Sequence, residues 1–134
     1  MTLEPFTIAP LAIQVHVVSV LGAAALGVWM FVQPKGTAVH RATGRVWMAI
    51  MVVAALSSFL IPATVLPVVG PFGAIHGLSV IVLAMVAAAI RAARTGRIRA
   101  HRRFVVGLYV GAILGAGAGA LVPGRMISRI LGYA

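Results

Sequence analysis

The stretch APLAIQVHVVSVLGAAALGVWMFVQ, residues 9–33, carries no charged side chain. As an α-helix it would be about 37 Å long, more than the about 30 Å of a bilayer's hydrocarbon core. Residues 38–61, 72–93 and 103–122 form three further apolar runs of similar length. The sequence therefore predicts an all-α integral membrane protein with four transmembrane helices. Turn residues at 34–37 and 94–97 pair these helices into two tandem helical hairpins, so we expect a four-helix bundle.

The composition excludes several kinds of chemistry. The 134 residues are 62% hydrophobic and 9% charged, whereas soluble domains carry about a quarter charged residues. Glu4 is the only acidic residue, and the chain has no cysteine. Paired-carboxylate catalysis, carboxylate-rich metal sites, disulfides and thiolate sites therefore have no residues to use.

The basic residues, which give a formal net charge of +10, gather in the turns. One membrane face holds Lys35, Arg41, Arg45, Arg91, Arg94, Arg97, Arg99, Arg102 and Arg103, and the other holds Arg125 and Arg129. By the positive-inside rule, both hairpin turns are cytoplasmic and both termini lie outside, in a bacterial inner membrane. This distribution predicts contact with anionic lipids at the cytoplasmic turns rather than with nucleic acid.

The first hairpin carries three local expectations. Residues 1–7 lack the basic flank of a signal peptide, so the first span is expected to be retained. Thr37 can cap the second helix. Trp29 and Trp47 flank the cytoplasmic turn and are expected at interfacial depth, as in aromatic belts.

The two halves of the chain repeat each other at their histidines. His16 and His76 are 60 residues apart, and His40 and His101 are 61 residues apart. Ser19 and Ser79 follow the first of these pairs at the same three-residue spacing. We therefore expect one membrane domain, residues 1–134, with repeats at about 9–62 and 72–123 and a short tail at 124–134.

The histidine positions predict two facing pairs near opposite membrane surfaces. His16 and His76 lie near the outer ends of helices that run in the same direction, and diagonal neighbours in a bundle can both face its axis. His40 and His101 lie at the cytoplasmic starts of the other two helices. Haem iron suits such pairs, because the porphyrin supplies four nitrogens and the protein supplies only axial ligands. Zinc normally takes three or four protein ligands, and copper or nickel would need ligands beyond the histidines.

The fourth apolar run is rich in glycine. Gly107, Gly111 and Gly115 follow one another at four-residue spacing, and Gly117 and Gly119 come after them. Two interpretations are compatible with this pattern: close packing of helices through small residues, and room for a flat cofactor against the backbone.

The motifs His40-Arg41 and His101-Arg102 give the chain a resemblance to known families. It resembles a bacterial family of small predicted membrane proteins of unknown function, whose His-Arg motifs open alternate helices. More remotely, it is similar to the two-haem b-type cytochromes of the ascorbate-linked kind. Their four-helix core holds one haem between the first and third helices and another between the second and fourth.

Over about residues 16–123, the resemblance implies an outer haem ligated by His16 and His76. It implies a second, cytoplasmic haem ligated by His40 and His101. One departure is that His40 and His101 lie closer to their helix starts than buried haem ligands usually do.

The predicted function is transmembrane electron transfer through one or two b-type haems, with Arg41 and Arg102 pairing with the propionates. No acid/base or nucleophile constellation accompanies these residues, so enzyme activity stays open. Two alternatives are a haem-free accessory or lipid-binding subunit and a carrier of a small molecule or metal. The bilayer is the expected partner, and a homodimer or a larger membrane complex is left open.

Overall fold

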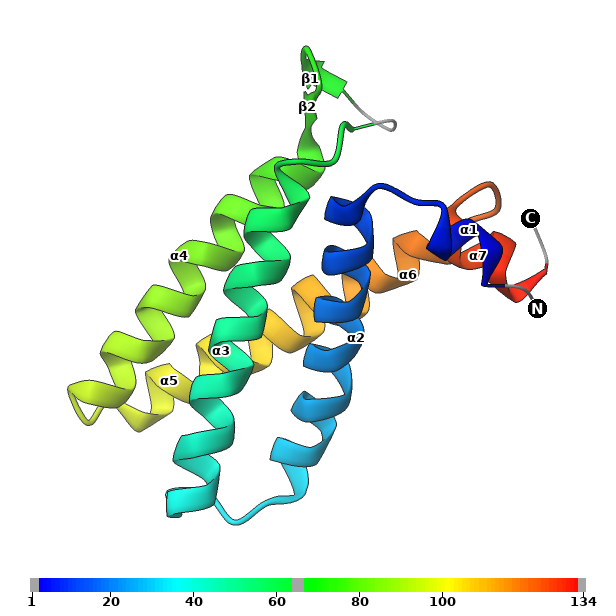
Figure 1. Cartoon of the computed structure of the whole chain (residues 1–134). Coiled ribbons are helices and arrows are strands. Elements are labelled where there is room, and N and C mark those ends of the chain that lie inside the picture. Colours follow the sequence, from blue (N-terminus) through cyan, green and yellow to red (C-terminus); the bar gives the residue numbers. More distant parts are fainter. Residues whose placement is uncertain (1–2, 64–66, 133–134) are drawn as a thin grey trace.

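The computed structural model describes residues 3–63 and 67–132, and its main elements are four long helices (Figure 1). Three are regular: α2 (Leu11–Val32), α3 (Ala38–Ser58) and α4 (Ala74–Arg94). The fourth is continuous over Ile98–Ala120 and consists of α5 (Ile98–Gly107), the π-helix η1 (Leu108–Gly115) and α6 (Ala116–Ala120). All four are long and apolar enough to cross a membrane. The predicted all-α, four-helix membrane fold is confirmed.

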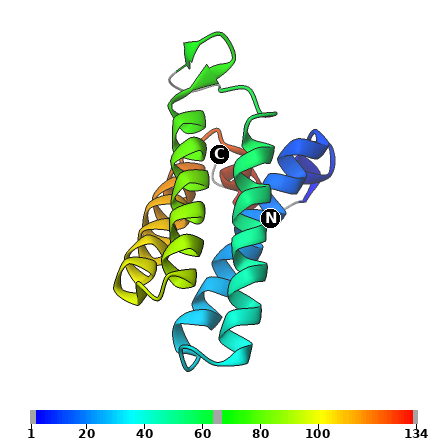
Figure 2. The ribbon, with the colours of Figure 1, turned by 90° about the vertical axis from the view of Figure 1, so that its left-hand side faces the viewer.

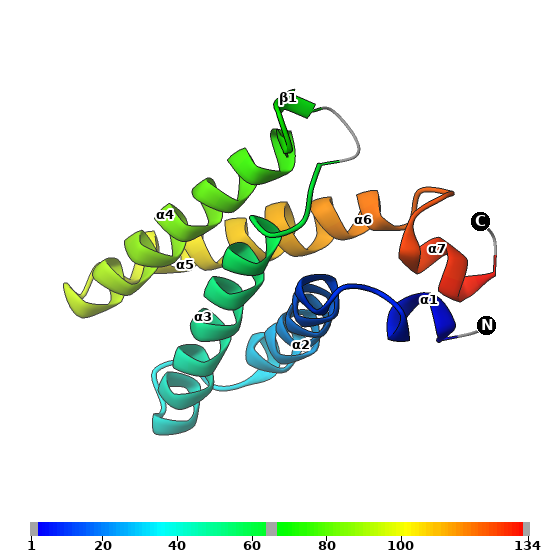
Figure 3. The same ribbon diagram turned by 45° about the horizontal axis from the view of Figure 1, so that its top comes forward.

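The helices pack mainly on their neighbours in the chain. α2 contacts α3, α3 contacts α4, and α4 contacts α5, while η1 also reaches α2. The fourth helix runs obliquely past the other three (Figures 1 and 3). Short helices at the two ends of the chain, α1 (Glu4–Thr7) and α7 (Met126–Leu131), contact each other. α1 and α7 therefore lie together on one side of the bundle (Figure 1), the side that faces away from the viewer in Figure 2.

The turn between α2 and α3 is fixed by side chains that satisfy helix ends. The Lys35 ammonium donates to the carbonyl oxygens of Met30, Phe31 and Gln33 at 2.6–2.9 Å. These are carbonyls that the end of α2 leaves without helical partners. Thr37 Oγ1 accepts from the His40 backbone N–H at 3.1 Å, which confirms the predicted cap of the second helix.

Two boundaries differ from the sequence-based expectation. The fourth helix begins at Ile98 instead of residue 103, because Gly96, with φ of +70°, completes the reversal in a short turn. The apolar connector ends in a small antiparallel hairpin, β1 (Pro67–Val69) and β2 (Phe72–Gly73), so the third helix begins at Ala74. Gly70, at φ of +55°, lies between these two strands.

The bundle core is small and draws on all four helices. Its buried side chains include Ala23, Met51, Val86 and Leu108. The outward faces are also apolar, with Leu21, Val28, Val80 and Val110 all more than half exposed. A water-soluble domain would bury such side chains, so these faces suit the hydrocarbon of a bilayer.

Trp47 is a core residue, so its predicted interfacial position is wrong. Its indole is 1% exposed, and Nε1 donates to the Ala23 carbonyl oxygen at 2.8 Å. Trp47 lies about 15 Å along α3 from Thr37, on the side that meets α2. Trp29, by contrast, is 56% exposed.

The closest glycine packing lies outside the glycine row of the fourth helix. A Cβ at Gly27 of α2 would collide with the ring of Tyr109, whose hydroxyl donates to the Ala24 carbonyl oxygen at 3.1 Å. In the row itself, a Cβ at Gly107 would approach the Met85 methyl to 2.8 Å, whereas Gly111 has open space. Most of the row is therefore not used for close contact between these helices.

Candidate functional site

His16 is anchored to the neighbouring helix through one ring nitrogen. Its Nδ1 donates to the Ala54 carbonyl oxygen at 2.8 Å and lies 3.3 Å from Ser57 Oγ. Because a carbonyl only accepts, Nδ1 carries the proton and Nε2 holds the lone pair. The ring is half-buried in α2, and no described residue engages Nε2. His16 could therefore still coordinate a metal through Nε2.

His76 uses both ring nitrogens within the protein. Nδ1 accepts from the Gly73 backbone N–H at 3.0 Å, and Nε2 lies 3.2 Å from the Ile61 carbonyl oxygen, to which it donates. The side chain is 5% exposed and packs against Phe59 and Phe72. As a result, His76 caps α4 and ties its start to the connector. Its imidazole has no lone pair free for a metal.

The two outer histidines are both tied to the end of α3, and no contact joins them to each other among the described residues. His16 Nδ1 lies within hydrogen-bond distance of Ser57 Oγ in α3. A hydrogen bond of 2.5 Å between the hydroxyl oxygens of Ser58 and Ser79 joins α3 to α4. Ser79 Oγ also donates to the carbonyl oxygen of Ile75, which lies in the same helix, α4. The serine hydroxyl near the His16 ring is that of Ser57 in α3.

His101 has the orientation typical of a metal-binding histidine. Its Nδ1 donates to the Ala89 carbonyl oxygen of α4 at 2.9 Å. This bond places the proton on Nδ1 and leaves Nε2 as the lone-pair nitrogen. Metal-ligating histidines are usually held in this way, by a hydrogen bond from the other ring N–H.

His40 is the one histidine whose Nδ1 lacks a partner. The half-buried side chain lies in the first turn of α3, and its buried Nδ1 has no hydrogen bond within the described chain. The imidazole interacts electrostatically with that of His101 and with the Lys35 ammonium. The structure thus brings the inner histidines, His40 and His101, within electrostatic range of each other.

Gln33, at the end of α2, is a second buried polar side chain near the start of α3. Its side chain is 8% exposed, and the buried Nε2 has no partner within the described chain. Thr43 Oγ1 donates its proton to the Val39 carbonyl oxygen at 2.9 Å and lies 3.5 Å from Gln33 Oε1 and 3.3 Å from the His40 carbonyl oxygen. Gln33 therefore sits over the same turn of α3 that carries His40.

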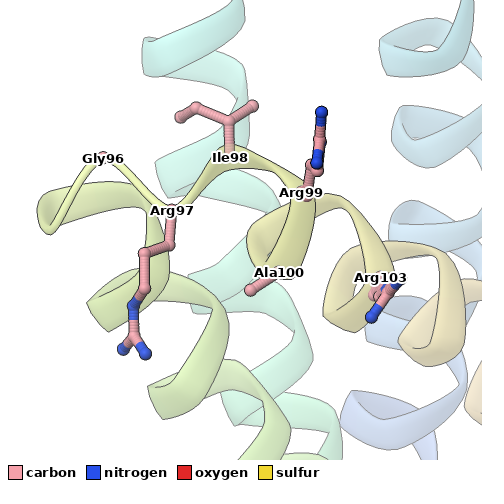
Figure 4. Close-up of a pocket in the computed structure, with 6 residues that line it drawn as sticks. All are labelled: Gly96, Arg97, Ile98, Arg99, Ala100 and Arg103. Atoms are coloured by element: carbon pink, nitrogen blue, oxygen red, sulfur yellow. The ribbon is translucent and has the colours of Figure 1, made fainter.

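The arginines beside the inner histidines differ in their engagement. Arg41 Nη1 donates to the Gly36 carbonyl oxygen at 2.6 Å, which holds this guanidinium over the α2–α3 turn. Arg102 is exposed on α5. At the α4–α5 turn, an open hollow of about 610 Å³ is lined by Arg97, Arg99 and Arg103 together with Gly96, Ile98 and Ala100. In this hollow Arg97 and Arg99 point in opposite directions (Figure 4).

The described residues contain no group of three or more histidine, cysteine or acidic side chains that could hold a metal ion. A metal that takes all its ligands from protein side chains has no such site there. A metal that brings its own equatorial ligands needs only two imidazoles. In the inner pair, His40 Nδ1 and His101 Nε2 have no hydrogen-bond partner among the described residues, whereas His76 of the outer pair has both nitrogens engaged.

The sequence-based reasoning missed Gln33, Ser57 and Ser58. Ser57 and Ser58 lie near the end of the second apolar run, and two adjacent hydroxyls in such a run could have indicated a polar contact. Gln33 ends the first run, and there its amide could equally have been an ordinary interfacial residue. Only the packing of α2 against α3 buries it.

The chain belongs to a family described as "Predicted membrane protein (DUF2306)", whose model matches residues 13–131. The resemblance to a family of small predicted membrane proteins is thereby confirmed. No curated protein and no solved structure matches the chain. The similarity to two-haem cytochromes stays a prediction.

Proposed function

We propose that this membrane protein transfers electrons through a b-type haem held by His40 and His101. The observation that supports it best is the pair itself. A buried His40 nitrogen lacks a partner, and the nearby His101 is oriented by its Nδ1–H bond to Ala89. A buried polar nitrogen left without a partner costs about 1–3 kcal/mol. A ligand at this imidazole would offset that cost.

The residues around the inner pair would tune such a site. Haem supplies one-electron chemistry when it is bound, and its potential depends on axial ligands, burial and nearby charge. Lys35 acts electrostatically on His40, and Arg41 and Arg102 directly follow the two histidines in the sequence. Positive charge stabilises the reduced, less positive state of an iron centre and pairs with propionates. These side chains would therefore raise the reduction potential.

A second haem at His16 and His76 would require a rearrangement. His76 would have to give up its hydrogen bond from Gly73 or the one to Ile61. We therefore assign the proposed haem to the inner pair and a structural role to His76.

The visible spectrum of the purified protein tests the proposal. Dithionite-reduced minus air-oxidised spectra, with pyridine haemochrome quantification, should give sharp α and Soret bands and about one haem per chain. His40→Ala and His101→Ala should each abolish the bands. His76→Gln, the matched control from the other repeat, should keep them. A colourless protein that takes up no added haem, or full haem content in His40→Ala, would reject the assignment.

The arginine-lined hollow supports a lipid-binding role beside this function. We propose that the α4–α5 turn contacts anionic lipid headgroups from the cytoplasmic side of a bacterial inner membrane. Arg97 and Arg99 diverge, so they suit an extended anionic surface rather than one small anion. Basic residues near such a surface contribute about 1 kcal/mol each to binding. If the protein proves colourless, this hollow favours the haem-free, lipid-binding alternative.

A further inference from the structure

The β1–β2 hairpin exposes apolar side chains at the end of the bundle away from the basic turns (Figure 1). Val68, Val69 and Phe72 are 75%, 72% and 48% exposed. Beside the hairpin, an open hollow of about 390 Å³ is lined mainly by apolar side chains, among them Phe59 and Val80. An apolar surface of this kind marks an interaction site rather than a face that meets water.

The absence of charge extends the membrane-facing surface of α4 into this hairpin. Residues 46–90 contain no arginine, lysine, aspartate or glutamate, so no charged side chain interrupts the connector between α3 and α4. Val80 lines the hollow and, like Ile81, is more than half exposed on α4. The apolar surface of the hairpin is therefore continuous with the outward face of α4, which suits the hydrocarbon of a bilayer.

Helix lengths place the hairpin at the boundary of the hydrocarbon. Measured from the innermost basic residues, α3 runs about 20 Å from Arg45 to Ser58, and α4 runs about 26 Å from Arg91 back to Ala74. Both lengths are smaller than the thickness of the hydrocarbon core, which is about 30 Å. The guanidinium groups can reach back toward the headgroups, which reduces the shortfall. The hydrocarbon therefore ends near the hairpin.

Hydrogen bonds pair several polar groups of the connector backbone. His76 Nδ1 accepts from the Gly73 N–H, and His76 Nε2 donates to the Ile61 carbonyl oxygen. The Ala63 N–H donates to the Pro71 carbonyl oxygen at 2.8 Å. Three connector residues have no N–H at all: Pro62, Pro67 and Pro71. Because unpaired backbone groups are costly next to hydrocarbon, this pairing suits a position against acyl chains.

We propose that the β1–β2 hairpin inserts its apolar side chains among lipid acyl chains, just below the headgroups of the leaflet opposite the basic turns. Acyl chains then fill the hollow that Phe72 and Val80 line. Interfacial elements bury an apolar face about 5–10 Å into the boundary between headgroups and acyl chains. The inference rests on the membrane fold and does not depend on the proposed haem.

Fluorescence quenching of single bimane labels in lipid nanodiscs, which leave both membrane faces open, provides the test. The label is attached to Val69→Cys, because the chain has no cysteine of its own and Val69 is exposed. Val68→Cys gives a second position in the same hairpin. Thr95→Cys, in the exposed α4–α5 turn, is the control for water, and Val80→Cys is the control for lipid. The quenchers are aqueous iodide and phosphatidylcholine that carries a doxyl group on carbon 5 of one acyl chain.

Both hairpin labels should be quenched by the doxyl lipid about as strongly as the Val80 label. Their quenching by iodide should be several-fold weaker than that of the Thr95 label. Iodide quenching equal to that at Thr95 would place the hairpin in water and overturn the proposal. Protection from both quenchers would also overturn it, because protein, such as a second copy of the chain, would then cover the hairpin instead of lipid.

Discussion

At the scale of single residues, the four histidines separate by what their Nδ1 atoms do. In His16 and His101, Nδ1 donates to a backbone carbonyl of a neighbouring helix, α3 for His16 and α4 for His101. In His76, Nδ1 accepts a backbone N–H and caps a helix. His40 alone leaves a buried Nδ1 unpaired. Matching positions in a repeat therefore do not have matching chemistry, because the local backbone differs at each.

Gly27 gives a residue-scale prediction about packing. Gly27→Ala should destabilise the protein by about 1–3 kcal/mol, because its Cβ would collide with the Tyr109 ring, which the bond to Ala24 holds in place. Thermal unfolding in detergent measures the effect. Gly22→Ala, on the same helix with open space around it, should be neutral or stabilising. Equal stability of the two variants would contradict the observed contact.

At the scale of elements, the fourth helix differs from the other three. Its middle third is a π-helix of eight residues, Leu108–Gly115, which contributes Leu108, Tyr109 and Ile113 to the core. The wider turn places the Tyr109 hydroxyl on the Ala24 carbonyl oxygen of α2. This contact helps the oblique fourth helix reach both α2 and α4. Long π-helical segments are rare and often mark functional regions.

The N-cap of α3 gives an element-scale prediction. Thr37→Ala should lower the free energy of unfolding by about 0.5–2 kcal/mol, because it removes the acceptor for the His40 backbone N–H. Thr37→Ser keeps the hydroxyl and should retain most of the stability. The comparison is made by thermal unfolding. Since the cap lies one turn from the imidazole of His40, loss of bound haem in Thr37→Ala but not in Thr37→Ser would also support the proposed site.

At the scale of the whole molecule, the two ends of the helix bundle differ in what connects the helices there. The two basic turns follow α2 and α4, whereas α1 precedes α2, the β1–β2 hairpin lies between α3 and α4, and α7 follows α6 (Figure 1). An even number of spans brings both termini to one side. The strong excess of arginine and lysine at the turns predicts that this side is outside.

Labelling of introduced cysteines tests this orientation directly, because the chain has none of its own. Ile8→Cys, 77% exposed in the wild type, should react with a membrane-impermeant maleimide in intact bacterial cells. Thr95→Cys, in the exposed α4–α5 turn, should react only after the membrane is disrupted. The reverse pattern would invert the proposed topology.

The sequence by itself determined the fold class and the four spans. Apolar runs of this length cross a bilayer as helices, because the backbone N–H and C=O groups of each run must form hydrogen bonds within the segment when hydrocarbon surrounds it. Local rules also sufficed for the Thr37 cap, because that bond spans three residues. The ends of the spans were less well defined by the sequence. The fourth helix begins at Ile98, within an arginine-rich segment whose polar composition gave no sign of a membrane helix.

Only the tertiary structure decided which polar groups are paired and which are not. The burial of Trp47 and Gln33 depends on how α3 packs against α2. The engagement of His76 depends on the carbonyl of Ile61 in the connector. Periodicity gives the face of a helix but not the partner it meets, because that partner is set by contacts between residues far apart in the chain. The repeat located the histidines, and packing alone distinguished the structural His76 from the unpaired His40.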